Sequence, residues 1–287
     1  MNLNKSKSLA VLLAVSLLAL TGCGAAEEAG GAASANAGVS KADSAVQAKK
    51  ITVAVASNSK PISYTDTDGK LTGYEVDVLR AIDDAVPEYE FNIESVSQSA
   101  EEVGIDTGKY ALIAQGAFKT ADREKKYLIP DENTGLSLIK IYSLKDKTDI
   151  KTLADLKGKK LAPVPPNGGI YNTLTAYNKA HPDTAVQFAT AENVPIANRF
   201  KELLDGKYDA VVWPSSNLDL TAIEKNLGSS FRASDPVQIN PTYLLIAKSQ
   251  TDFYNKVNAA VKKLKQDGTL VKLSQKYFGE NIFDYQK

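Results

Sequence analysis

Residues 166–169, Pro-Asn-Gly-Gly, precede a stretch of helical spacing, and this arrangement suits the binding of an anion. The first backbone N–H groups of a helix have no partner inside the helix, and the helix dipole adds positive charge at the same end. A carboxylate or phosphate can therefore bind there. A Gly-rich turn alone is unspecific, and the position of Asn167, Gly168 and Gly169 after a predicted strand is what favours a binding role.

Arg123 is a second candidate, because its side chain is suited to a carboxylate. A planar guanidinium donates two parallel hydrogen bonds to a carboxylate and stays charged at any physiological pH. Arg123 lies in the charged run 119–124, Lys-Thr-Ala-Asp-Arg-Glu. From the residues alone, a surface arginine is the simpler interpretation.

Groups that could catalyse a reaction are scarce in this chain. His181 is the only histidine, and because Pro182 follows it at a predicted helix end, a solvent-exposed helix terminator is its simpler role. The motifs HExxH, GxSxG and CxxC and a phosphate-cradling loop are absent from the sequence. We therefore expect a protein that is not an enzyme and uses no metal or cofactor. Carboxylates acting as acid and base leave an enzyme as the lesser alternative.

The single cysteine, Cys23, is predicted to be a lipidation site. Lys5 and Lys7 precede an apolar run at 9–20, which is the order of an export signal. At roughly 12 residues this run is too short to span about 30 Å of hydrocarbon comfortably. Leu-Thr-Gly-Cys at 20–23 matches the lipobox, in which the thiol receives a diacylglyceryl group before cleavage. A buried free thiol and a chance match are the alternatives.

The N-terminal part is accordingly divided into a lipoprotein signal peptide at 1–22 and a flexible tether at 23–49. The tether is rich in Ala, Gly, Ser and Glu and has almost no large apolar residue to offset its chain entropy. Two or three acyl chains hold a protein firmly at a bilayer, whereas one does not. We therefore expect a protein that is lipid-anchored on the extracytoplasmic face of the cell membrane.

The charge of the chain is balanced, with 34 basic and 34 acidic residues and a formal net charge of zero. This balance provides no excess of positive charge that would favour binding to nucleic acid. The roughly 237 residues after the tether suffice for two lobes, each with a core of its own.

Short β-branched runs alternate with helical patterns after the tether, which predicts an α/β fold with parallel sheets covered by helices. Asp68-Gly69 predicts the tight turn of a hairpin. The predicted strands lie at 51–55, 91–94, 110–114, 136–143, 160–164, 186–189, 209–213 and 243–247. One predicted helix begins after Gly73, and another ends at Thr107. Two more span 170–180 and 197–204, and a pair of helices separated by Gly268 ends the chain.

Several short motifs occur in a characteristic order after the tether. They are Gly-Tyr-Glu-Val-Asp at 73–77, Gly-Lys-Tyr at 108–110, Thr-Ala-Asp-Arg at 120–123, Asp-Leu-Lys-Gly-Lys at 155–159, Asp-Gly-Thr-Leu at 267–270 and Lys-Tyr-Phe-Gly at 276–279. Each is weak alone, but the ordered set resembles the type II periplasmic binding proteins of the amino-acid and cystine cluster. The resemblance extends from Lys50 to the end of the chain.

The resemblance implies a two-lobed type II fold with two crossing strands as the hinge. Lobe 1 is expected from 50–138 and 242–287, and lobe 2 with the hinge strands from 139–241. The implied function is the substrate-binding component of an ABC importer, which captures an amino acid or a related small carboxylate by lobe closure and delivers it to a membrane permease. A monomer is expected. A ligand-presenting sensor or receptor, or a dehydratase-like enzyme of the same fold, is the alternative.

In such proteins an arginine at the position of Arg123 binds the carboxylate of the ligand, and the loop at 167–169 contacts the same carboxylate from the opposite lobe. Tyr171 and Trp213 lie near the mouth of that loop, although core packing accounts for both equally well. Phe118 replaces a residue that is frequently small or hydroxylated, which fits either a stacking wall or a core side chain. The other implied ligand-binding residues in this segment are Gln115, Gly116 and Thr120.

The sequence departs from the family where an ammonium group is usually bound. An acid that often follows the buried strand of lobe 2 corresponds to Pro214, and an acid and an aromatic residue of the first loop correspond to Ala56 and Ser59. An unpaired ammonium in a closed site is costly. Either other acids, carbonyls or hydroxyls bind it, or the ligand is not a standard α-amino acid. The hydroxyl and amide candidates are Ser57, Asn58 and Ser215.

Overall fold

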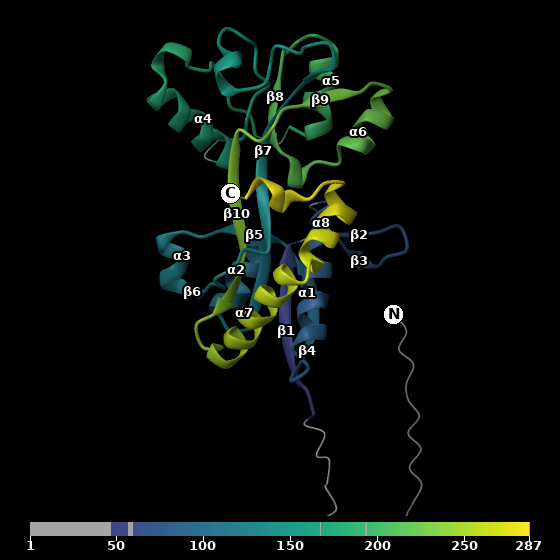
Figure 1. Cartoon of the computed structure of the whole chain (residues 1–287), viewed down its shortest axis with the longest axis vertical. Coiled ribbons are helices and arrows are strands. Elements are labelled where there is room, and N and C mark those ends of the chain that lie inside the picture. Colours follow the sequence, from purple (N-terminus) through teal and green to yellow (C-terminus); the bar gives the residue numbers. More distant parts are fainter. Residues whose placement is uncertain (1–46, 57–59, 167, 193, 287) are drawn as a thin grey trace, which may run out of the picture. The chain divides into compact units, whose positions relative to one another are not determined.

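A computed structural model of the chain describes residues 47–56, 60–166, 168–192 and 194–286. These residues form an α/β fold in which two lobes are connected by two long strands (Figure 1). The predicted signal peptide, the lipidation site Cys23 and the tether up to residue 46 lie outside the described residues, as do Ser57, Asn58, Ser59 and Asn167. Within the described part of the chain, no helix is long and apolar enough to cross a membrane.

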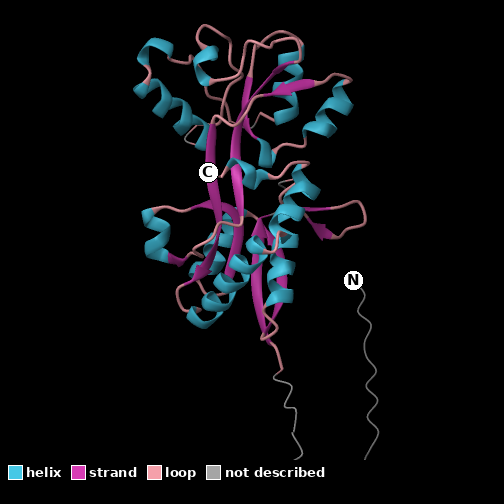
Figure 2. Cartoon of the chain, in the orientation of Figure 1, coloured by secondary structure: helices cyan, strands magenta, loops and turns pink. Residues whose placement is uncertain are grey.

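One mixed sheet runs through both lobes (Figure 2). Its strands, in spatial order, are β4 (Tyr89–Val96), β1 (Lys49–Ala56), β5 (Leu112–Phe118), β10 (Gln238–Ala247), β7 (Gly135–Leu144) and β8 (Val211–Pro214). β1 is parallel to β4 and β5, as the sequence predicts, whereas β10 and β7 run antiparallel to their neighbours. The short strands β6 (Tyr127–Leu128) and β9 (Phe231–Ala233) pair with β10 and β7.

The connecting strands are β7 and β10, which pair with each other from Gly135 to Ile139 and from Gln238 to Thr242. All residues of β7 except Leu144 are buried, because its sequence is an almost continuous apolar run. β10 pairs with β5 of lobe 1, and β7 pairs with β8 and β9 of lobe 2. The two strands therefore join one lobe to the other.

Lobe 1 is covered by helices whose apolar faces follow the helical spacing in the sequence. α1 (Tyr74–Ala85) buries Val78, Leu79 and Ile82 against the same core that receives Phe253 and Val257. The other helices of this lobe are α2 (Gln98–Asp106), α3 (Ala121–Lys126), α7 (Thr251–Gln266) and α8 (Thr269–Phe278). Gly268, with a φ of 79°, separates α7 from α8, as predicted.

Lobe 2 has cores of its own, in which α4 (Gly169–Ala180), α5 (Ile196–Leu204) and α6 (Leu220–Leu227) pack beside β8. The strands predicted at 160–164 and 186–189 are wrong as regular strands, since only the isolated bridges Leu161–Ala210 and Val164–Thr190 form there. Proline has no N–H to donate to a ladder. The first of these segments contains Pro163 and is followed by Pro165 and Pro166.

A small hairpin, β2 (Tyr64–Thr65) and β3 (Leu71–Thr72), lies at the side of lobe 1 (Figure 1). The predicted Asp68-Gly69 turn lies at its tip, where Gly69 has a φ of 78°. Asp66 closes the turn by accepting hydrogen bonds from the backbone N–H groups of Asp68 and Lys70, at 3.0 and 2.9 Å. The remaining 3-10 turns are η1 (Leu153–Leu156), η2 (Pro182–Thr184), η3 (Ser215–Asn217) and η4 (Ile282–Tyr285).

Candidate ligand-binding cleft

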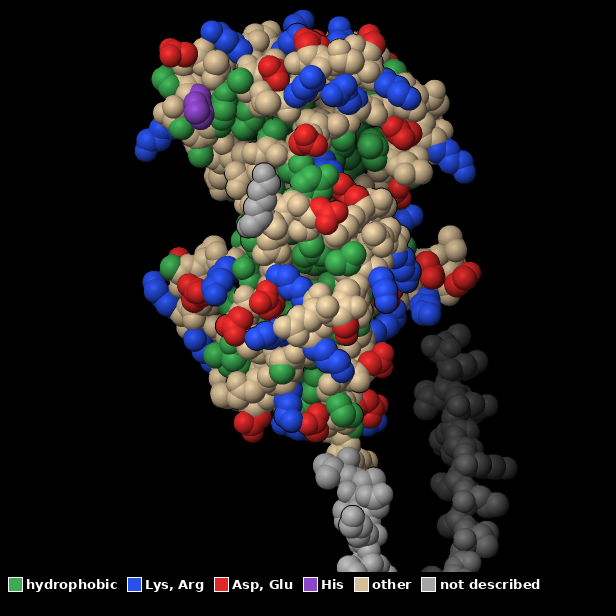
Figure 3. Space-filling view, in the orientation of Figure 1, with side chains coloured by type: hydrophobic (Ala, Val, Ile, Leu, Met, Phe, Trp, Pro, Cys, Tyr) green, Lys and Arg blue, Asp and Glu red, His purple; other side chains and the backbone are tan. Residues whose placement is uncertain are grey.

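A cleft of about 340 Å³ lies between the two lobes. Its lobe 1 wall comes from the end of β1, the start of α1 and the end of β5, and its lobe 2 wall from the start of α4 and the end of β8. The first residues of β7 lie between these walls. Figure 3 shows the indentation that separates the two lobes. The volume is at the lower end of the range for small-molecule sites.

The lobe 1 wall is formed by Gln115, Gly116 and Phe118 of β5 beside Tyr74 and Glu75 of α1. Gly116 has a φ of 62°, a left-handed conformation that glycine adopts without strain. Its backbone N–H donates a 2.6 Å hydrogen bond to Oε1 of Glu75, which fixes the carboxylate against the strand. The Tyr74 hydroxyl donates to the Thr134 carbonyl at 2.6 Å. These bonds hold the start of α1 at the cleft.

The lobe 2 wall contains the start of α4, as the sequence predicts for an anion site. Gly168 and Gly169 line the cleft, and α4 begins without a side-chain cap on its first N–H groups. A Cβ at Gly169 would lie only 3.9 Å from Cε2 of Phe118, so the Phe118 ring reaches from lobe 1 to this helix end.

Of the predicted ligand-binding residues, the structure brings Gln115, Gly116, Phe118, Gly168, Gly169 and Trp213 to the cleft wall. Arg123, Thr120, Tyr171 and Ser215 do not line it in this structure. Tyr171 instead packs against Phe188 in the lobe 2 core, with ring centroids 5.7 Å apart. Ser215 begins the η3 turn, whose next two residues, Ser216 and Asn217, reach the cleft.

Arg123 lies behind the end of β5. Its Nη1 donates to the Phe118 carbonyl at 2.9 Å, and its backbone N–H donates to Oγ1 of Thr120 at 3.3 Å. Thr120 is the N-cap of α3, so the motif that contains both residues forms a local turn. This turn supports the strand end that carries Phe118.

Glu75 is the only Asp, Glu, Lys, Arg or His among the described residues that line the cleft. Its side chain is 7% exposed. Burial raises the pKa of Glu75 to about 7, and the hydrogen bond from Gly116 opposes part of this rise. Its Oε2 is buried and has no hydrogen-bond partner among the described residues. The sequence places Glu75 in a family motif and in the helical repeat after Gly73, and an acid in that apolar spacing is a signal of burial.

Ala56 and Pro214 both line the cleft, so the departures from the family fall within the site. The wall also carries polar groups that the sequence did not single out, namely Gln98, Ser137, Ser216, Asn217 and Thr242. Among the described residues, no three His, Cys, Asp or Glu side chains are grouped to hold a metal ion. The cleft therefore offers hydrogen-bonding groups, aromatic surface and one carboxylate.

Known proteins agree with this architecture. Residues 51–280 match the family of bacterial extracellular solute-binding proteins, family 3. The chain belongs to this family. Among relatives of this family 3 protein, the L-cystine-binding protein TcyA of Bacillus subtilis (strain 168) is 29% identical over 286 residues, which cover 97% of this chain and 99% of TcyA. The probable amino-acid-binding protein YxeM of the same strain is 30% identical over 289 residues, which cover 99% of each chain.

Solved structures of similar proteins share the two-lobed type II fold. The probable amino-acid ABC transporter extracellular-binding protein ytmK of Bacillus subtilis has a TM-score of 0.73 at 23% identity, covering 83% of this chain and 100% of that one. A structure concerning glutathione import via GshT and the cystine ABC importer TcyBC of Streptococcus mutans has a TM-score of 0.63 at 29% identity, covering 82% of this family 3 protein and 97% of its own chain.

Proposed function

We propose that this family 3 protein is the substrate-binding component of an ABC importer and binds an amino acid or a related small carboxylate between its lobes. The observation that carries the proposal is the cleft itself, in which the open start of α4 on lobe 2 faces the end of β5 on lobe 1. A carboxylate suits the N–H groups of α4. Relatives described as L-cystine-binding and amino-acid-binding proteins support this ligand class.

Arg123 is proposed to be the second group that binds the ligand's carboxylate. Nη1 of Arg123 is bonded to the carbonyl of Phe118, a residue of the cleft wall. The ring of the same residue lies beside Gly169 at the start of α4. The carboxylate is then held from both lobes, with Gln115, Gly116, Thr120 and the hydroxyl of Ser215 around it.

Binding is proposed to close the lobes about β7 and β10. The lobe boundaries are 50–138 with 242–287 for lobe 1 and 139–241 for lobe 2. Only two strands connect the lobes within this sheet, so small changes in their backbone angles rotate one lobe against the other. A ligand that touches both walls stabilises the closed form, because it binds that form better. A membrane permease then receives the ligand from it.

The protein is proposed to act as a lipid-anchored monomer on the extracytoplasmic face of the membrane. The support is the apolar run before Cys23, the lipobox that ends there, and the tether that follows. A membrane-attached protein stays near its permease, which raises the effective concentration of one for the other.

A thermal-shift screen tests the proposed function. The full chain, purified in detergent, is heated with L-cystine, the twenty amino acids, glutathione, and the corresponding acids that lack the amino group. A ligand at about 100 times its Kd stabilises the folded state by about 2.7 kcal/mol, which raises Tm by about 5–10 °C in a protein of this size. Absence of any shift across this panel would contradict binding of a small carboxylate.

A further inference from the structure

Three buried side chains beside the cleft have polar atoms without hydrogen-bond partners among the described residues. They are Glu75 at Oε2, Glu101 at both carboxyl oxygens, and Gln115 at both amide atoms. Nearly all buried polar groups in folded proteins have a partner, so each exception needs a reason. Their concentration beside one cleft points to a common reason.

Two of these three side chains, Glu75 and Gln115, line the cleft, and they reach it from α1 and β5. Glu101 lies behind them on α2, which packs against β1 and β5, and its side chain is fully buried. One oxygen of Glu75 is already bonded to the N–H of Gly116. The other, Oε2, is buried and has no hydrogen-bond partner among the described residues.

The polar groups of the cleft wall indicate which kind of ligand group would bind at Glu75. A carboxylate oxygen only accepts hydrogen bonds, and the amide oxygen of Gln115 also accepts them. No positively charged side chain is present among the described residues of the wall to neutralise Glu75. A primary ammonium has three donors and the opposite charge, so it satisfies the free oxygen of Glu75 and the amide oxygen of Gln115 together.

We propose that Glu75 is the residue that binds the ammonium group of the ligand, with Gln115 as a second acceptor, in place of the acids absent at Ala56 and Pro214. This assignment rests on the proposed function. It gives an amino acid a defined orientation, since its ammonium lies against Glu75 and its carboxylate lies between Arg123 and the start of α4. The site therefore recognises a zwitterion rather than a simple carboxylic acid.

The assignment makes ligand binding depend on pH. The groups that interact with Glu75 are the N–H of Gly116 on β5, Glu101 on α2, and the adjacent Tyr74. Burial, aided by the charge of Glu75, raises the pKa of Glu101 to about 9, which leaves that group neutral at pH 7. Because burial also raises the pKa of Glu75, an ammonium ligand must displace a proton from it at low pH.

The matched variants Glu75→Gln and Glu101→Gln test the assignment in the full chain. Affinities are measured by calorimetry for the amino acid that gives the largest thermal shift among L-cystine and the twenty amino acids, and for the same acid without its amino group. For L-cystine this second probe is 3,3′-dithiodipropionic acid. We expect Glu75→Gln to weaken binding of the amino acid about 30-fold or more, as loss of a buried charge partner does, and to change binding of the deaminated acid little. Glu101→Gln should bind the amino acid in preference to the deaminated acid to the same extent as the wild type does.

A pH series on the wild type gives an independent readout if Glu75→Gln does not fold. Affinity for the amino acid should fall below about pH 7, approaching tenfold per pH unit, whereas affinity for the deaminated acid should not fall in this way.

An unchanged preference of folded Glu75→Gln for the amino acid over the deaminated acid, or a flat pH profile for the amino acid, would overturn the assignment. Binding of deaminated acids alone would overturn it and leave the carboxylate-binding function standing. Binding of neither probe class would contradict the proposed function itself.

Discussion

The Arg123 guanidinium has donors to spare at the end of β5. Its Nη1 is bonded to the Phe118 carbonyl, while Nη2 and Nε have no acceptor among the described residues. A guanidinium in this state can form a bidentate contact with a carboxylate without breaking its existing bond. These free donors support the proposal that Arg123 binds the ligand's carboxylate.

Replacement of Arg123 by alanine should weaken binding of the ligand by about 2 kcal/mol or more, because a charged hydrogen-bond donor is lost from the carboxylate. The control is Lys125→Ala, which removes a neighbouring cation whose 3.2 Å pair with Asp122 is exposed. The affinities of both variants are measured by isothermal calorimetry with the ligand found in the thermal screen. Equal affinities of the two variants would show that Arg123 does not touch the ligand.

Residue types alone predicted a helix that begins near Gly169, with free N–H groups that suit an anion, whereas the position of Glu75 needed the structure. A sequence shows that an acid occupies an apolar spacing, but it does not show which atoms satisfy that acid. Here the left-handed Gly116 turns its N–H toward one carboxyl oxygen and leaves the other without a protein partner among the described residues. That distinction arises from contact between residues 41 positions apart in the chain.

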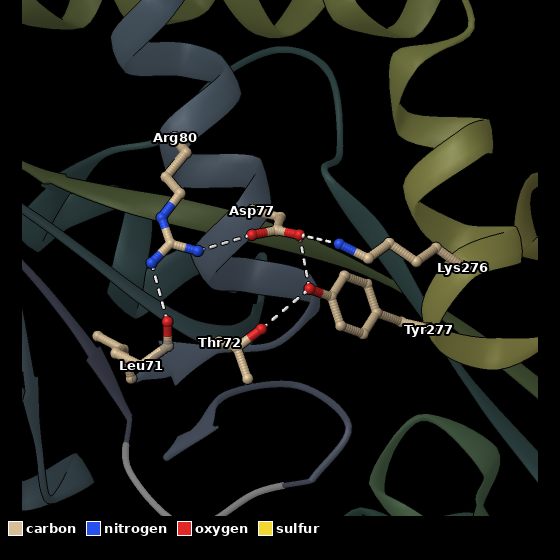
Figure 4. Close-up of polar contacts among 6 residues, drawn as sticks. All are labelled: Leu71, Thr72, Asp77, Arg80, Lys276 and Tyr277. Carbon is tan, nitrogen blue, oxygen red and sulfur yellow. Dashed lines mark hydrogen bonds and ion pairs between the residues drawn. The ribbon is translucent and has the colours of Figure 1, made fainter. Parts of the chain in front are cut away.

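At the scale of elements, Asp77 joins α1, α8 and the β2–β3 hairpin (Figure 4). Its carboxylate accepts hydrogen bonds from Arg80 at 2.8 Å, Lys276 at 2.6 Å and Tyr277 at 2.5 Å. Arg80 also donates to the Leu71 carbonyl at 2.8 Å. Burial opposes ionisation of Asp77, but the bonds from Lys276, Tyr277 and Arg80 outweigh it and hold the pKa of Asp77 below its usual value.

We expect Asp77→Asn to lower the free energy of unfolding by about 1.5 kcal/mol at pH 7, since three charged or hydroxyl donors lose a carboxylate acceptor. A lowered folded-state pKa means that this stabilisation is complete above the unfolded pKa of about 4 and is lost as pH falls below it. Urea unfolding of both proteins at pH 7 and at about pH 3 measures the difference in their free energies of unfolding. Asp122→Asn, in an exposed ion pair, should change stability by less than about 0.5 kcal/mol at either pH. A difference between wild type and Asp77→Asn that does not shrink in acid would contradict the role given to the charge.

The helices and the lobe 1 strands were predictable because their apolar spacing is a local property. α4 and α5 begin within one residue of their predicted positions at 170 and 197. The continuous sheet was not predictable, because its order depends on β10 returning from late in the chain to lie between β5 and β7. In lobe 2, two predicted strands form only isolated bridges. The first contains Pro163, which cannot donate a backbone N–H to a strand ladder, and apolar composition alone does not reveal this effect.

At the scale of the whole molecule, two ion pairs among the described residues join the lobes as bounded above, namely Lys140 with Glu280 and Lys60 with Asp219. Nζ of Lys60, in the chain between β1 and β2 of lobe 1, lies 3.3 Å from Oδ2 of Asp219 at the start of α6 in lobe 2. Asp219 also caps α6 through a 3.0 Å hydrogen bond from Ala222, whereas Lys60 has no part in that cap. A change at Lys60 therefore tests the contact between lobes without unfolding the end of a helix.

Lys60→Ala should destabilise the closed form slightly and weaken ligand binding by about 0.5 kcal/mol, roughly twofold, because both members of the pair are partly exposed. The effect should vanish in about 1 M salt, where the screening length falls to about 3 Å. The control is Lys50→Ala, which removes an exposed pair with Glu90 inside lobe 1 and should leave affinity unchanged at any salt concentration. If both variants bind the ligand like the wild type at low salt, the two lobes close without help from the Lys60–Asp219 pair.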